Sequence, residues 1–106
     1  MKPLSEHLTQ LIDIAEYVMR RPAQHIVRAL PLGFAAAAAE IRRVHALPAE
    51  ATRTTRAGIV MCEAIEGFAA DGREYHWQML IGATLPVLRR EAYLAFCNER
   101  ELVRDQ

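Results

Sequence analysis

The sequence predicts an all-α fold, a compact antiparallel bundle of four to six helices. Apolar residues recur at steps of three and four in several segments, which is the period of an α-helix. No segment alternates apolar and polar residues with a period of two, so strands are not expected anywhere. The chain has 106 residues, which is enough for one hydrophobic core, and residues 1–106 are therefore expected to form a single helical domain.

The first half of the chain contains three expected helices. The first spans 5–21, where apolar residues follow the helical period and Ser5 can serve as N-cap. The stretch 22–31 lies between two prolines and has room for a short helix with proline at its first position. A third helix is expected over 33–47, with its apolar residues on one side and arginines on the other.

The second half predicts one further helix and then a long one. The apolar period over 54–70 ends at Asp71-Gly72, which supplies the glycine that helix C-termini prefer. From Arg73 a helical period continues to the end of the chain. It is interrupted at Pro86, which has no N–H to donate to the carbonyl of Gly82. We expect this last helix to be kinked or broken near Pro86.

The stretch GFAAAAAE, residues 33–40, places five alanines in a row inside one expected helix. Side chains this small bury little apolar area, but they allow another helix to come nearer than the usual axis separation. That neighbour is either a helix of the same chain or the equivalent helix of a second copy. Gly58 and Gly82, each within a helical pattern, suggest close approach of a neighbour in the same way.

Composition favours a cytoplasmic protein without a cofactor. Thirteen basic and thirteen acidic residues give no net charge, which disfavours direct nucleic-acid binding. Cys62 and Cys97 form no CxxC pair and predict neither a disulfide framework nor a zinc site, but reduced, buried thiols. The first residues, MKPLSEHLTQ, lack an apolar signal core, and no apolar run is long enough for a membrane helix.

The best candidate for chemistry is a carboxylate and histidine set. If Asp71-Gly72 turns between two antiparallel helices, then Glu63, Glu66 and His76 lie near the turn and could bind a metal in a metal-dependent enzyme. The repeated Glu-x-x-His pairs of di-metal bundles are missing, however, so a solvated polar face explains these residues better. No nucleophile with a base and no glycine-rich phosphate loop is found, and we expect no enzymatic activity.

Contact with another polypeptide is the remaining expectation, because the helices carry more apolar face than one short chain can bury. Tyr75, His76 and Trp77 are consecutive on a helix and cannot all face one core, and exposed tyrosine and arginine are typical of interfaces. The arginine doublets could form a basic patch, but arginine near a helix C-terminus also simply opposes the macrodipole. The residues expected to contact a partner or a second copy are Phe34, Ala35, Ala38, Arg42, Tyr75, Trp77 and Tyr93.

In size, composition and helical layout, with stretches such as GFAAAAAEIRRVHAL and REYHWQML, the chain resembles small quorum-sensing antiactivators of the QslA type. The resemblance implies a cytoplasmic homodimer that binds a LuxR-type transcription activator and blocks its dimerisation or DNA binding without chemistry. It transfers no functional residue. An inhibitor or adaptor of another protein complex, encoded by a phage or by its host, is the alternative within the same class of function.

Overall fold

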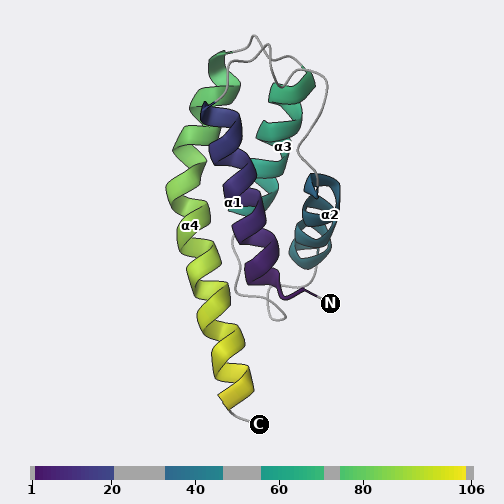
Figure 1. The fold of residues 1–106 in the computed structure, drawn as a ribbon, viewed down its shortest axis with the longest axis vertical. Helices are drawn as coiled ribbons and strands as arrows, with labels where there is room; N and C mark the ends of the chain where they lie inside the picture. Colours follow the sequence, from purple (N-terminus) through teal and green to yellow (C-terminus); the bar gives the residue numbers. More distant parts are fainter. Residues whose placement is uncertain (1, 21–32, 47–55, 71–74, 105–106) are drawn as a thin grey trace.

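The computed structural model describes residues 2–20, 33–46, 56–70 and 75–104, without the side chains of Tyr75 and of 102–104. These residues form four α-helices and no strand (Figure 1). The helices are α1 (Leu4–Arg20), α2 (Phe34–His45), α3 (Ala57–Ala70) and α4 (Tyr75–Arg104). The all-α prediction is confirmed for the described residues, which contain four of the expected helices. The short helix predicted over 22–31 and the turn at Asp71-Gly72 lie outside the described residues.

The long helix α4 is the spine of the bundle. It packs along α1 and α3, while the shorter α2 packs against α1 and α3. With 30 residues α4 is about 45 Å long, close to the full 49 Å of the molecule, whose other two dimensions are 22 and 21 Å. Its C-terminal end therefore extends past the other helices (Figure 1). No helix in the described segments is both long and apolar enough to span a membrane.

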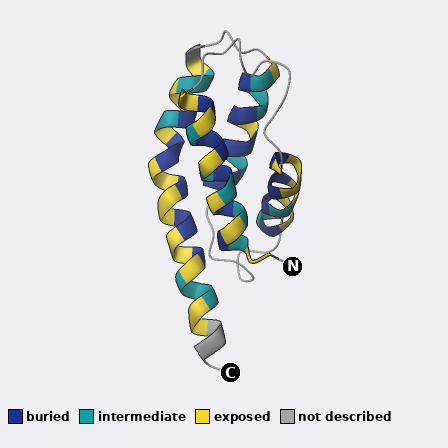
Figure 2. Cartoon of the chain, viewed as in Figure 1, coloured by how far each residue is buried: buried dark blue, intermediate teal, exposed yellow. Residues whose placement is uncertain are grey.

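The core is formed where the apolar stripes of all four helices meet, as the helical period predicts. The buried stripe of α1 continues through those of α2 and α3 to that of α4 (Figure 2). The largest fully buried side chains are Phe68, Leu8, Leu11, Ile41, Met61, Ile65, Ile81 and Leu88. Their burial supplies most of the free energy that holds the helices together, since isolated helices of this length are marginal in water.

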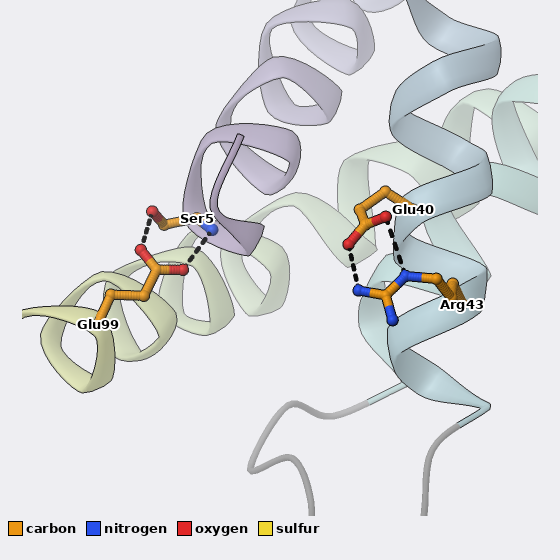
Figure 3. A network of polar contacts seen from close by, with 4 residues as sticks. All are labelled: Ser5, Glu40, Arg43 and Glu99. Carbon is orange, nitrogen blue, oxygen red and sulfur yellow. Dashed lines mark hydrogen bonds and ion pairs between the residues drawn. The ribbon is translucent and has the colours of Figure 1, made fainter. Parts of the chain in front are cut away.

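The N-terminus of α1 is capped from the far end of the chain, and the prediction of Ser5 as N-cap is wrong. The helix begins one residue earlier, and the carbonyl of Pro3 accepts from the amides of Glu6 and His7. Ser5 instead donates to the carboxylate of Glu99 in α4, from its backbone N–H at 2.9 Å and from its hydroxyl (Figure 3). The acidic group at this helix end also complements the positive pole of the helix dipole. Sequence reasoning missed it because the partner lies 94 residues away.

Pro86 does not break the last helix, contrary to the expectation of a break there. α4 runs without interruption through this position, and Pro86 lies on its exposed side. The proline removes one hydrogen bond and its ring crowds the carbonyl of the residue four positions earlier. That residue is Gly82, and the helix on either side of Pro86 is held by packing on α1 and α3.

Some alanines of the run are buried in the core and others are exposed on the surface. Ala37 and Ala38 are buried inside the chain, whereas Ala35, Ala36 and Ala39 are exposed. For Ala37 and Ala38, the neighbours that the small side chains allow to come close are therefore helices of the same chain. The run begins after Gly33, which has φ +88° and whose added Cβ would lie 2.0 Å from the amide nitrogen of Gln10. The positive φ favours glycine there, whereas the flexible Gln10 side chain could move aside for a Cβ.

Helices α2 and α3 approach each other closely at Gly58 of α3. A Cβ at this position would lie 2.7 Å from Cγ2 of Ile41 and 3.3 Å from Nε2 of His45. The predicted close approach is confirmed here. It is not found at Gly82, where an added Cβ would meet only the terminal methyl of Met19 at an ordinary 3.6 Å.

The two cysteines are free thiols in different surroundings, Cys62 buried and Cys97 partly exposed. Burial raises the pKa of the Cys62 thiol to about 11. At pH 8 only about one in a thousand of these thiols is ionised, and only the thiolate reacts with alkylating agents.

We therefore expect iodoacetamide at pH 8 to modify one cysteine per folded chain, and both after unfolding in guanidinium. Mass spectrometry of the intact protein and its peptides counts and locates the adducts. Modification of Cys62 should become faster as the pH approaches 11. Equal rates for both thiols in the folded protein at pH 8 would contradict the buried placement of Cys62.

Candidate protein-binding surface

Helix α4 has two apolar faces. One packs into the core through Ile81, Leu85, Leu88, Ala92 and Ala95. The other side of the helix also carries large apolar residues, but they are exposed to solvent (Figure 2). A surface helix normally places polar residues there, so this second face is the unusual feature of the molecule.

Three of the exposed residues repeat at intervals of seven. Leu80, Val87 and Leu94 are 37%, 51% and 45% exposed, and we call them the α4 row. Residues seven apart on a helix differ by only about 20° in direction, so the three side chains follow one another along the same side. Such a row is the pattern on which a second helix packs.

A groove runs between α1 and α4 on another side of α4. It has a volume of about 490 Å³ and is bridged near its two ends, by Ser5 with Glu99 and by Glu16 with Arg89. The residues that line this α1–α4 groove are Lys2, Ser5, Glu6, Thr9, Gln10, Asp13, Ala92, Tyr93 and Phe96. The groove exists because the small Ala92 leaves space between the two helices.

Two aromatic side chains from α4 form one wall of the groove. Tyr93 is 66% exposed and Phe96 is 47% exposed. The guanidinium carbon of Arg100 lies 5.6 Å from the centre of the Phe96 ring, within the range of a cation–π contact. Hydrogen bonding to Cys97, one turn further along the helix, raises the pKa of Tyr93. Both rings are thus held in place while leaving much of their surface uncovered.

A buried polar pair lies where the four helices meet. Nε2 of His45 is 3.1 Å from a carboxylate oxygen of Glu91, and the two side chains are only 3% and 1% exposed. Gly58 makes room for the imidazole, since a side chain there would press on it. Polar groups at this depth must satisfy one another, so the pair fixes how α2 sits against α4.

Three of the exposed arginines form close pairs with carboxylates. Arg42 contacts Glu66 at 2.7 Å, Arg43 contacts Glu40 at 2.6 Å (Figure 3), and Arg89 contacts Glu16 at 2.7 Å. These hydrogen bonds raise the pKa of Arg42 and Arg43 and lower that of Glu16 and Glu40. As solvent-exposed pairs they contribute little to stability. Each pair neutralises the charge of its own arginine.

The predicted contact residues on α2 divide between core and surface. Phe34 and Ala38 are buried in the chain's own core and present no surface to a partner. Ala35 is exposed, and Arg42 is exposed but paired with Glu66. The structure does not bring these four together on one face.

The predicted contact residues on α4 are placed differently from one another. Tyr93 is exposed and lines the groove. Trp77 is half-buried and packs on Gly67 of α3, where an added Cβ would lie 2.6 Å from the indole ring. Trp77 therefore joins α3 to α4. Tyr75 is the first residue of α4, and its side chain lies outside the described residues.

The metal site considered for Glu63, Glu66 and His76 does not form. Glu66 is bound to Arg42, and His76 contacts the ring of Trp77. Within the described segments, no three residues among histidine, cysteine, aspartate and glutamate lie close enough together to hold a metal ion. Their spacing along the sequence placed them near one turn but could not fix their directions.

Sequence reasoning missed the exposed residues Val87, Leu94 and Phe96. Leu80 and Phe96 belong to the helical period that predicts the last helix, yet both lie at the margins of the buried stripe and remain exposed. The repeat of seven from Leu80 to Leu94 was the available signal, because it marks a second line of large apolar residues beside the buried stripe. No protein-family model matches the chain, and comparison with curated proteins and with solved structures returned no match.

Proposed function

We propose that this chain is a non-enzymatic protein-binding module and that the α4 row is its main contact surface. The observation that carries the proposal is the exposure of Leu80, Val87 and Leu94 on a helix whose other face already fills the core. Full burial of an apolar side chain of this size contributes about 1.5 to 3 kcal/mol, and covering these half-exposed side chains contributes about half of that each. A row of three along nearly the same line suits a helical partner.

In its more specific form, the proposal is a small bacterial antiactivator. The partner would be a LuxR-type transcription activator, as the resemblance in size and helical layout suggests, and inhibition would follow from occupancy of the activator's dimerisation or DNA-binding surface. A second copy of the chain is a further partner for the same row, giving a homodimer.

Leu94→Asp tests this proposal. The change places a charge in the middle of an apolar contact, and we expect it to weaken partner binding by about 2 kcal/mol or more, which is about 30-fold in affinity. Binding to a purified LuxR-type activator is measured by isothermal titration calorimetry, and self-association by sedimentation equilibrium. Circular dichroism checks that the variant folds, which is expected because Leu94 is outside the core.

Ala35→Asp is the matched control, because it places the same charge on the exposed side of α2. It should leave both measurements unchanged. If Ala35→Asp loses the partner and Leu94→Asp keeps it, the contact surface is the alanine run and the assignment to α4 is wrong. If the wild-type chain binds neither the activator nor itself, and affinity capture returns a different complex, the antiactivator form fails and an adaptor of that complex replaces it.

A further inference from the structure

We propose that the α1–α4 groove receives an arginine-bearing segment of the partner protein. This inference rests on the proposed protein-binding function and names the chemistry of the partner. The groove and the α4 row are separate surfaces, because the adjacent residues Tyr93 and Leu94 point about 100° apart on the helix. A partner can therefore engage either surface without the other.

The charge of the groove favours a cationic occupant. Glu6 and Asp13 line the α1 side, and within the described part of the chain neither carboxylate takes part in an ion pair. They are seven residues apart, or about 10 Å along the helix, so the groove offers two separate carboxylates rather than one cluster. Lys2 is the single cation among the lining residues and lies at the end nearest Ser5.

The aromatic wall favours a guanidinium over other cations. Tyr93 and Phe96 face the acidic side across the groove with much of their ring surface uncovered. A planar guanidinium stacks on such a ring while its N–H groups reach a carboxylate, and arginine does this better than lysine. The chain already shows the contact, since its own Arg100 lies over Phe96.

The floor of the groove limits what else can bind. Ala92 and the rings beside it are apolar and accept an aliphatic side chain or the methylene stem of an arginine. Nucleic acid and anionic lipid would bring phosphates toward two carboxylates, which is repulsive. A polypeptide segment with an arginine next to an apolar residue fits both the apolar floor and the two carboxylates of the groove.

The test uses the full chain and a short fluorescein-labelled peptide of alanine, leucine and arginine. A twin peptide carries glutamine in place of every arginine. Fluorescence anisotropy is expected to show that the arginine peptide binds about ten-fold more tightly than the glutamine peptide. In the double variant Glu6→Gln/Asp13→Asn this preference should disappear, and Tyr93→Ala should weaken binding of the arginine peptide about ten-fold.

The control variant Glu63→Gln/Glu101→Gln removes the same amount of negative charge from exposed sites outside the groove. It should keep the preference for the arginine peptide. An equal loss in this control would show that general charge attraction, and not the groove, binds the peptide, and would overturn the inference. Equal affinity of the wild-type chain for both peptides would overturn it as well.

Failure of this inference is distinguishable from failure of the proposed function. Leu94→Asp is expected to lose the partner protein yet bind the arginine peptide with unchanged affinity, because Leu94 does not line the groove. If partner binding depends on Leu94 but the chain shows no preference for the arginine peptide, the proposed protein-binding function is supported and the proposal for the groove is wrong. If the peptide preference is found but Leu94→Asp keeps the partner, the α4 row is not the contact surface.

Discussion

Replacing Glu91 with leucine is expected to lower the free energy of unfolding by about 3 kcal/mol or more. The replacement leaves His45 buried, at 3% exposure, without the carboxylate that lies 3.1 Å from its ring nitrogen. A buried polar group without a partner has lost its hydrogen bonds to water and has no hydrogen bond within the protein to replace them. Urea denaturation, followed by circular dichroism and by the fluorescence of Trp77, measures the loss.

The double variant His45→Leu/Glu91→Leu is the decisive comparison. The double variant also removes the histidine ring that Glu91→Leu leaves unpaired, so it should be more stable than Glu91→Leu alone. If the two single changes simply add in the double variant, the pair is not coupled, and the role given to it in joining α2 to α4 is wrong.

Gly58→Ala is expected to lower the free energy of unfolding by about 1 to 3 kcal/mol. The new methyl group would lie 2.7 Å from Ile41 and 3.3 Å from the ring nitrogen of His45, so α2 and α3 must move apart. That movement disturbs the core and the buried polar pair together. Thermal and urea unfolding measure the change.

Gly82→Ala is the matched control for Gly58→Ala, since both exchange a helical glycine for alanine. At position 82 the methyl meets only Met19 at 3.6 Å. The gain in helix propensity should then dominate and raise stability by about 0.5 to 1 kcal/mol. The same substitution is thus expected to act in opposite directions at the two sites. Stabilisation at both would show that α2 does not press on α3 at Gly58.

The helical period was sufficient to predict the class of fold and the four described helices, because the alternation of apolar and polar residues is a local property. It could not predict interactions between distant residues. Nothing near Ser5 indicates that Glu99 caps α1, and nothing near His45 indicates that it reaches Glu91. The break expected at Pro86 was wrong for a related reason. The helical residues before and after Pro86 are held in place by packing on other helices, which the local sequence does not show.

The candidate surface was less predictable than the fold. Tyr93 was expected to project outward and does, whereas Phe34 and Ala38 were expected at an interface and lie in the core. Residues at the edge of an apolar stripe can be either buried or exposed, and the sequence does not say which. The outcome depends on where the neighbouring helices lie. For Leu80 and Phe96 the position of these helices decides between core and surface.

The cap on α1 has a consequence for how the bundle is assembled during synthesis. The carboxylate of Glu99, which caps its first turn, lies 94 residues later in the sequence than Ser5. Arg89, which pairs with Glu16, lies 73 residues later than Glu16. Pairing elements so distant in sequence slows folding relative to bundles built from successive hairpins. Helix α1 therefore obtains these two polar contacts only once α4 has been synthesised, and until then its apolar face is covered by α2 and α3 alone.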